Sequence, residues 1–91
     1  MSNGFEQLLK KYQASFADKQ SKLKKAWENK DILQLHNLLH KLAGSSGSYG
    51  YNKINTIARH GMNLTRDEKN YIHEEVEWCL DHLFSLLNKP L

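Results

Sequence analysis

Leucines recur at helical spacing in the middle of the chain and mark one buried face there. They fall at i, i+3, i+4 and i+7, the spacing of a single helical stripe: Leu35, Leu38, Leu39 and Leu42. At about 100° per residue, His40 lies far round the helix from this stripe, on the same outer face as Gly44. The pattern therefore predicts an exposed imidazole one helical turn before a residue that has no side chain.

An amphipathic segment also precedes this one, and it predicts a first helix that runs to about Glu28. Its inward residues are expected to be Phe5, Leu8, Leu9, Tyr12, Phe16, Leu23, Ala26 and Trp27. Because the stripe thins after Phe16, a kink or break is expected near residues 17–18. Asn3 with Glu6 resembles a capping box and is expected to begin this helix.

Capping residues and glycines predict the bounds of the second helix. Asp31 is expected to cap it, with Gln34 as the reciprocal partner, and the helix continues through His40 to about Ser46. A tight connection is expected to follow, because glycine adopts left-handed conformations freely; its residues are Gly47, Ser48 and Gly50.

Two further helices are predicted after this connection. The third covers residues 51–63 and is expected to bury Ile54, Ile57, Ala58 and Met62. Thr65 with Glu68 forms a capping box for the fourth, and Pro90 lies just beyond the end of that helix. The fourth helix is expected to bury Ile72, Val76, Cys79, Leu83, Phe84 and Leu87.

Four amphipathic helices with short connections can bury their stripes by packing antiparallel. The predicted fold is all-α, an antiparallel up-down-up-down four-helix bundle. The chain has 91 residues, so we expect a single domain over 1–91.

Composition narrows the classes of partner and compartment. The net charge is +3, which is mild, and the lysines at 22, 24 and 25 read as the solvated face of the first helix. We therefore expect no nucleic-acid partner. There is no run of about 18 apolar residues and no signal peptide, so no membrane association and a cytoplasmic location are expected. Cys79 is the only cysteine and is expected to be buried in a reducing compartment.

Residues 40–50 read HKLAGSSGSYG and carry the candidate chemistry. Glycine inside a helix costs about 0.5–1 kcal/mol relative to alanine, so Gly44 calls for a reason. One reason is that the backbone of a partner must approach the imidazole of His40. The competing interpretation is an ordinary surface histidine near a helix end, with Gly44 or Gly47 as the cap.

The whole string resembles the histidine-containing phosphotransfer (HPt) domain of two-component phosphorelays. The pattern of that family is a His, an aliphatic residue two positions on, a Gly at four, two small residues, and a Gly at ten. The matching residues are His40, Leu42, Gly44, Ser45, Ser46 and Gly50. The resemblance extends from about Phe5 to Leu87.

The resemblance implies a phosphorelay intermediate without kinase activity of its own. His40 would accept a phosphoryl group, through Nε2, from the aspartyl phosphate of a receiver domain and pass it to a second receiver aspartate. The expected partners are response-regulator receiver domains and a hybrid sensor kinase, and we expect a monomer. No cofactor of its own is expected, because the receiver would supply the divalent cation.

Residues near His40 are assigned supporting roles on the same basis. Lys41 and Ser45 are expected to offset charge on the phosphoryl oxygens, and Gly44 to leave the approach open. The docking rim is expected to include His36, Asn37 and Tyr49.

Two departures from the family pattern keep a second function open. Many members carry Lys three residues after the His, where this chain has Ala43. Many also carry Gln or Glu on the next helix, where Met62 stands and cannot orient the imidazole well; Asn63 or a water is a possible substitute. The alternative function is a non-phosphorylated helical interaction module, a degenerate HPt domain, that binds a signalling partner.

Two other functions fit the residues less well. His36 and His40 are four apart, a spacing that can hold zinc, but no HExxH motif or cysteine pair accompanies them. Residues 44–50 resemble a phosphate loop only superficially, because no strand precedes them and no GK[ST] ending follows. We therefore expect no metal site and no nucleotide site.

Overall fold

Five helical segments make up the fold of a computed structural model, which describes residues 4–88. They are α1 (Gly4–Ala14), α2 (Phe16–Glu28), α3 (Ile32–Ser48), α4 (Asn52–Leu64) and α5 (His73–Leu87). Within residues 4–88 there is no strand, so the all-helical prediction is confirmed. None of these helices is long and apolar enough to cross a membrane.

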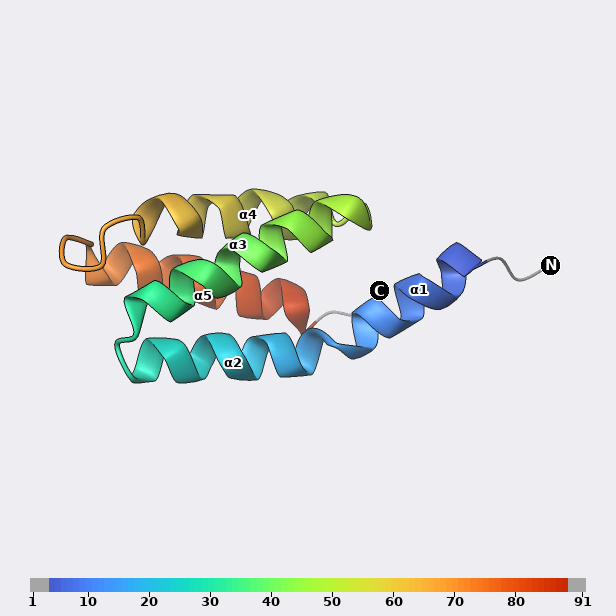
Figure 1. Cartoon of the computed structure of the whole chain (residues 1–91), viewed down its shortest axis with the longest axis horizontal. Helices are drawn as coiled ribbons and strands as arrows, with labels where there is room; N and C mark the ends of the chain where they lie inside the picture. Colours follow the sequence, from blue (N-terminus) through green and yellow to red (C-terminus); the bar gives the residue numbers. More distant parts are fainter. Residues whose placement is uncertain (1–3, 89–91) are drawn as a thin grey trace.

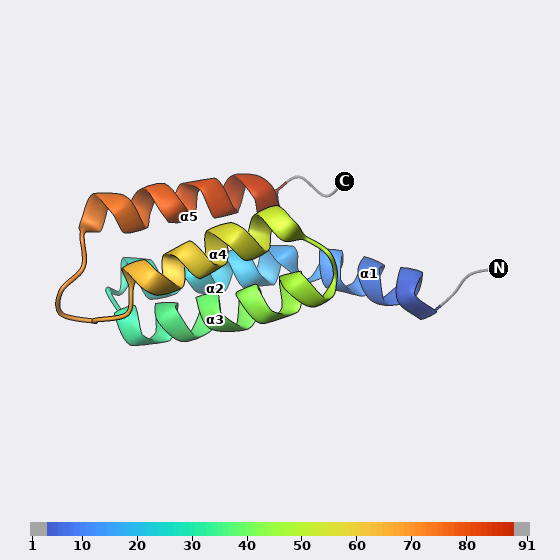
Figure 2. The same ribbon diagram turned by 90° about the horizontal axis from the view of Figure 1, so that it is seen from above.

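Helices α2 to α5 lie lengthwise beside one another (Figures 1 and 2). The most extensive contact is between α3 and α4; α5 packs on α4 and α2, and α2 packs on α3. In both views the chain changes direction at each connection between these four helices. α1 continues the line of α2 past the end of the bundle, which gives the molecule extents of 50 × 19 × 18 Å.

The core is a column of aliphatic side chains from all four bundle helices. Its completely enclosed members include Leu23, Leu35, Leu39, Val76, Leu80 and Leu83. Burying each contributes about 1.5–3 kcal/mol of hydrophobic free energy. The stripe predicted for the second helix is confirmed at its centre, where Leu35 and Leu39 are both 0% exposed. This burial fixes which side of α3 faces solvent.

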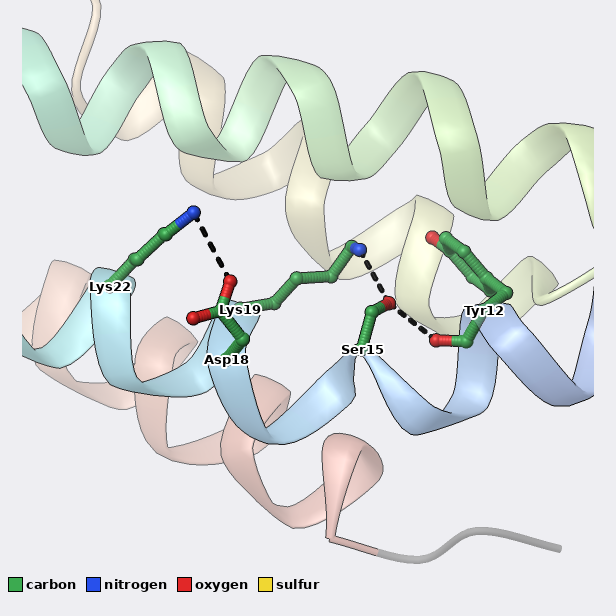
Figure 3. A network of polar contacts seen from close by, with 5 residues as sticks. All are labelled: Tyr12, Ser15, Asp18, Lys19 and Lys22. Atoms are coloured by element: carbon green, nitrogen blue, oxygen red, sulfur yellow. Dashed lines mark hydrogen bonds and ion pairs between the residues drawn. The ribbon is translucent and has the colours of Figure 1, made fainter.

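The break in the first predicted helix lies at Ser15, two residues before the expected site. The Ser15 hydroxyl donates to the carbonyl oxygen of Tyr12 at 2.5 Å and accepts from Nζ of Lys19 at 2.7 Å (Figure 3). A serine that bonds back to the preceding turn competes with the helix ladder and bends it. Figure 3 also shows Lys22 paired with Asp18 at 3.1 Å on the next turn.

The inward stripe predicted for the first helix is wrong at its beginning. Phe5 and Leu8 are 51% and 49% exposed, because α1 extends beyond the bundle and has little to pack against. Tyr12 is the buried residue of α1. The cap predicted at Asn3 and the position of Pro90 lie outside the described residues.

The expected start of α3 is confirmed, and its end lies two residues later than predicted. The Asp31 carboxylate accepts from the backbone N–H of Gln34 at 3.1 Å, which satisfies one free donor of the first turn. Gly47 and Ser48 belong to the helix rather than to the connection. The turn depends on Gly50, whose φ of +81° is accessible to glycine at little cost.

The capping box predicted at Thr65 and Glu68 is wrong, and the last helix begins eight residues later. Thr65 ends α4: its buried hydroxyl donates to the carbonyl oxygen of Gly61 at 2.8 Å. Residues 65–72 form a loop, in which Asp67 accepts from the N–H of Lys69. Ile72 precedes α5 in an extended conformation and is 59% exposed, so its predicted place in the core is also wrong.

Candidate functional site

His40 stands on the solvent side of α3, as the leucine stripe predicts. Its neighbour Leu39 is 0% exposed, whereas His40 itself is exposed. The ring of His40 has no hydrogen-bond partner among residues 4–88. One turn on, a Cβ placed on Gly44 would meet no atom within 4 Å. The structure therefore places an accessible imidazole beside bare helix backbone.

A groove of about 280 Å³ runs between α3 and α4 beside this imidazole. It is lined by His40, Ala43, Gly44, Asn55, Arg59 and Met62. The family pattern described above predicts that Met62 lies opposite His40, and in the structure both residues line the same groove. Asn63 does not line this groove; its Oδ1 accepts from the guanidinium of Arg66 at 2.9 Å.

Asn55 holds the two walls of the groove together. Its side-chain amide donates to the carbonyl oxygen of Ala43 at 2.6 Å, and this bond links α4 to the turn of α3 that follows His40. A Cβ on Gly47 would stand 3.1 Å from that amide nitrogen. Gly47 therefore serves close approach of α4 rather than the chain turn that the sequence suggested.

His36, one turn before His40, is partly buried and hydrogen-bonded. Its Nδ1 lies 3.1 Å from Oγ1 of Thr65. The Thr65 hydroxyl donates to the carbonyl oxygen of Gly61 at 2.8 Å, so its oxygen is available to accept a hydrogen bond from an N–H at Nδ1 of His36. This bond joins α3 to the end of α4, and the predicted docking-rim residue His36 is therefore also a structural link.

Lys41 and Ser45 line a different groove, of about 290 Å³, between α3 and α2. The Ser45 hydroxyl lies 2.6 Å from the phenol oxygen of Tyr12. Burial raises the pKa of Tyr12, and burial lowers the pKa of Lys19 in the same region. The supporting roles of Lys41 and Ser45 stay predictions, since neither residue lines the groove that contains His40.

The two remaining rim residues are placed at different distances from His40. Asn37 is exposed on the preceding turn of the same outer face. Tyr49 ends α3, nine residues beyond His40 and about 13 Å further along the helix axis. Its ring stacks on Tyr12 with centroids 4.4 Å apart, in an aromatic cluster that joins α1 to the bundle.

Sequence reasoning missed Arg59 and Asn55 as groove residues. Both share a helix face with Met62, because 55, 59 and 62 are spaced i, i+4 and i+7. That spacing is the signal that would have found them, once Met62 had been placed opposite His40. This spacing gave no signal in the search for apolar stripes, because Asn55 and Arg59 are polar.

Metal-ligating side chains are dispersed over the described surface. Residues 4–88 contain no cluster of three or more His, Cys, Asp or Glu side chains that could hold a metal ion. Cys79 is buried with a free thiol, which donates to the carbonyl oxygen of Ile57 at 3.3 Å. Burial raises the pKa of this thiol to about 11.

Comparison with known protein families agrees with the geometry. The family model of the Hpt domain matches residues 7–87. Searches of curated proteins and of solved structures return no match. Hpt domains in general carry out histidine phosphotransfer in phosphorelays, as phosphoryl carriers rather than kinases, and interact with receiver domains and kinases. Because the match spans nearly all of the chain, the protein belongs to the Hpt domain family.

Proposed function

We propose that this protein accepts a phosphoryl group on His40 from the aspartyl phosphate of a receiver domain and passes it to another receiver aspartate. The observation that carries the proposal is the exposed ring of His40 beside Gly44, where an added Cβ would meet no atom within 4 Å. A receiver domain can bring its own active site against such a surface without displacing a side chain of this chain.

For this reaction the carrier has to supply mainly a correctly positioned nucleophile. The Nε2 lone pair of neutral His40 attacks phosphorus as the phosphorus–oxygen bond to the aspartyl carboxylate breaks, which regenerates the free carboxylate. Transfer onward reverses these steps on a second receiver. Phosphoryl transfer depends chiefly on alignment and charge neutralisation, and we expect the receiver to supply the divalent cation. Lys41 stays a proposed source of positive charge at the rim.

The supporting framework is proposed to be an antiparallel up-down-up-down bundle. The changes of chain direction between α2, α3, α4 and α5 in Figures 1 and 2 support it. We propose that the carrier is monomeric. We also propose that it works in a reducing, cytoplasmic compartment, because Cys79 is a buried free thiol.

A second function rests on Met62. This residue lines the groove where a hydrogen-bonding side chain would orient the imidazole, and no residue in 4–88 bonds the ring of His40. These observations favour, as the alternative, a helical module that binds a signalling partner without being phosphorylated.

Phosphotransfer from labelled receivers separates these two functions. Receiver domains from the same cell, phosphorylated with ³²P on aspartate, are mixed with the unaltered chain and with His40→Gln, His36→Gln and His60→Gln. We expect label on the unaltered chain and on His60→Gln, in an acid-labile, base-stable linkage, and none on His40→Gln. His36→Gln is expected to retain the label unless loss of the Thr65 bond unfolds it, which circular dichroism reports. Label on His40→Gln would refute the assignment, and receiver binding without any transfer would favour the interaction module.

A further inference from the structure

Arg59 is the side chain of the α3–α4 groove that carries a permanent charge. From α4 it lines the same groove that His40 and Gly44 line from α3. The other residues from α4 in this groove are Asn55, whose amide already donates to Ala43, and Met62, whose thioether is a weak acceptor. Among the described lining residues, Arg59 therefore offers the strongest hydrogen-bond donors beside the imidazole.

The guanidinium of Arg59 is exposed and makes no hydrogen bond or ion pair with any of residues 4–88. Two cations of α2 that face α3 are already engaged: Lys22 pairs with Asp18, and Lys19 donates to Ser15. Lys41 is exposed on α3 itself, but it lines the groove on the α2 side rather than the one that contains His40. An arginine with no carboxylate beside it keeps its full charge and its forked donors for an external anion.

We propose that Arg59 binds the phosphoryl group on His40 and neutralises part of its charge, a role that rests on the function proposed above. A phosphoryl group on Nε2 adds close to two negative charges and three acceptor oxygens at the edge of this groove. Two parallel N–H donors of a guanidinium match two of those oxygens. In this chain α4 thus supplies the cation, and Lys41 opens onto the groove on the other side of α3.

The second ionisation of the phosphoryl group gives a direct measure of this contact. A neighbouring positive charge favours the dianion and lowers the pKa of the phosphoryl group. The site is open to solvent, so screening keeps the effect small, and we expect a shift of about 0.3–1 pH unit. A merely structural role of Arg59 would leave this pKa unchanged.

The test uses potassium phosphoramidate on the full chain, so that no receiver is needed. The Nε2 lone pair attacks phosphorus, the phosphorus–nitrogen bond of phosphoramidate breaks, and ammonia leaves. The ³¹P chemical shift of the product is then followed against pH for the unaltered chain, Arg59→Gln, Arg59→Lys and Lys53→Gln. Lys53 is the matched control, because it is exposed on α4 but lines a groove with His82 rather than with His40.

We expect Arg59→Gln to raise the pKa of the phosphoryl group by about 0.3–1 unit, Arg59→Lys to recover part of the shift, and Lys53→Gln to change nothing. An equal pKa in Arg59→Gln and the unaltered chain would overturn the role of Arg59 alone. An equal rise in Lys53→Gln would overturn it too, by showing that only net charge matters. If His40 of the unaltered chain takes up no phosphoryl group from phosphoramidate or from a phosphorylated receiver, the proposed function falls and this inference with it.

Discussion

Gly44 and Gly61 lie in different surroundings on the paired helices α3 and α4: Gly44 lines the open groove, and Gly61 is buried in the core. A Cβ on Gly44 would meet no atom within 4 Å, whereas one on Gly61 would stand 3.0 Å from Leu39 Cδ1 and 3.1 Å from Cys79 Sγ. Both residues lie in helices, where glycine is unfavourable relative to alanine. Gly61 has an internal reason to be small, because α3, α4 and α5 meet there.

Gly44 has no such reason within the described structure. No described residue occupies the space beside its missing side chain, and under the proposed function that space is left for the receiver that approaches His40. The comparison shows that Gly61 serves packing, and we propose that Gly44 serves a partner. Stability and phosphotransfer should therefore respond in opposite ways when the two positions are changed.

The largest effect is expected for Gly61→Val. Its branched side chain enters a sealed contact between Leu39 and Cys79, so we expect overpacking to lower the free energy of unfolding by about 2–3 kcal/mol. Urea denaturation followed by circular dichroism measures this loss. Under conditions where the variant is still folded, its phosphotransfer should remain close to normal. An unchanged free energy of unfolding would show that the contact of Gly61 with Leu39 and Cys79 can widen without loss of stability.

Gly44→Arg should produce the reverse result. A long side chain now blocks the approach to His40, and we expect transfer from a receiver to slow about 30-fold, equivalent to about 2 kcal/mol at a docking surface. The unfolding free energy should hardly change, because Gly44 is exposed. Ser21→Arg, on the exposed face of α2, is the matched control for added charge. Transfer at the normal rate by Gly44→Arg would contradict the docking role of this face.

The buried thiol of Cys79, which packs near Gly61, should make the free energy of unfolding depend on pH in the alkaline range. The pKa of Cys79 is raised by burial to about 11 from an ordinary value of 9.0. Above pH 9 the unfolded chain therefore loses a thiol proton that the folded chain retains, and stability falls as pH rises. The unaltered chain should lose about 2 kcal/mol of its advantage over Cys79→Ala between pH 8 and 11. A pH-independent difference in urea denaturation would contradict this burial effect.

The smallest effect is expected for Gly44→Ala. An exposed helical glycine replaced by alanine should raise the free energy of unfolding by about 0.5–1 kcal/mol, since nothing obstructs the added methyl group. Thermal denaturation measures the gain. A loss of stability instead would reveal a structural use of Gly44 within this fold.

Periodicity predicted the parts of the fold that burial controls. The stripe of α3 and the exposure of His40 followed from the leucine spacing, and the cap at Asp31 followed from local chemistry. Thr65 was misassigned because the same hydroxyl can begin one helix or end another. Its bond to Gly61 is preferred here, and its pairing with His36 depends on tertiary packing.

The candidate site was predicted on α3, whereas on α4 only Met62 was predicted and Asn55 and Arg59 were missed. A sequence motif places residues along one helix, so it identified His40 and Gly44. Arg59 enters the groove only through the packing of α4 on α3, which Asn55 and Gly47 adjust. For the same reason Ser45, close to His40 in sequence, lies on the side that faces Tyr12.

The most direct test of the account is to locate the phosphoryl group on the chain after transfer from a receiver. Heteronuclear NMR of ¹⁵N-histidine-labelled protein identifies the modified ring and the nitrogen that is bonded to phosphorus. We predict phosphorus on Nε2 of His40, with His36 unmodified and still bonded to Thr65. Phosphorus on any other histidine, or transfer that leaves His40 free, would contradict the account.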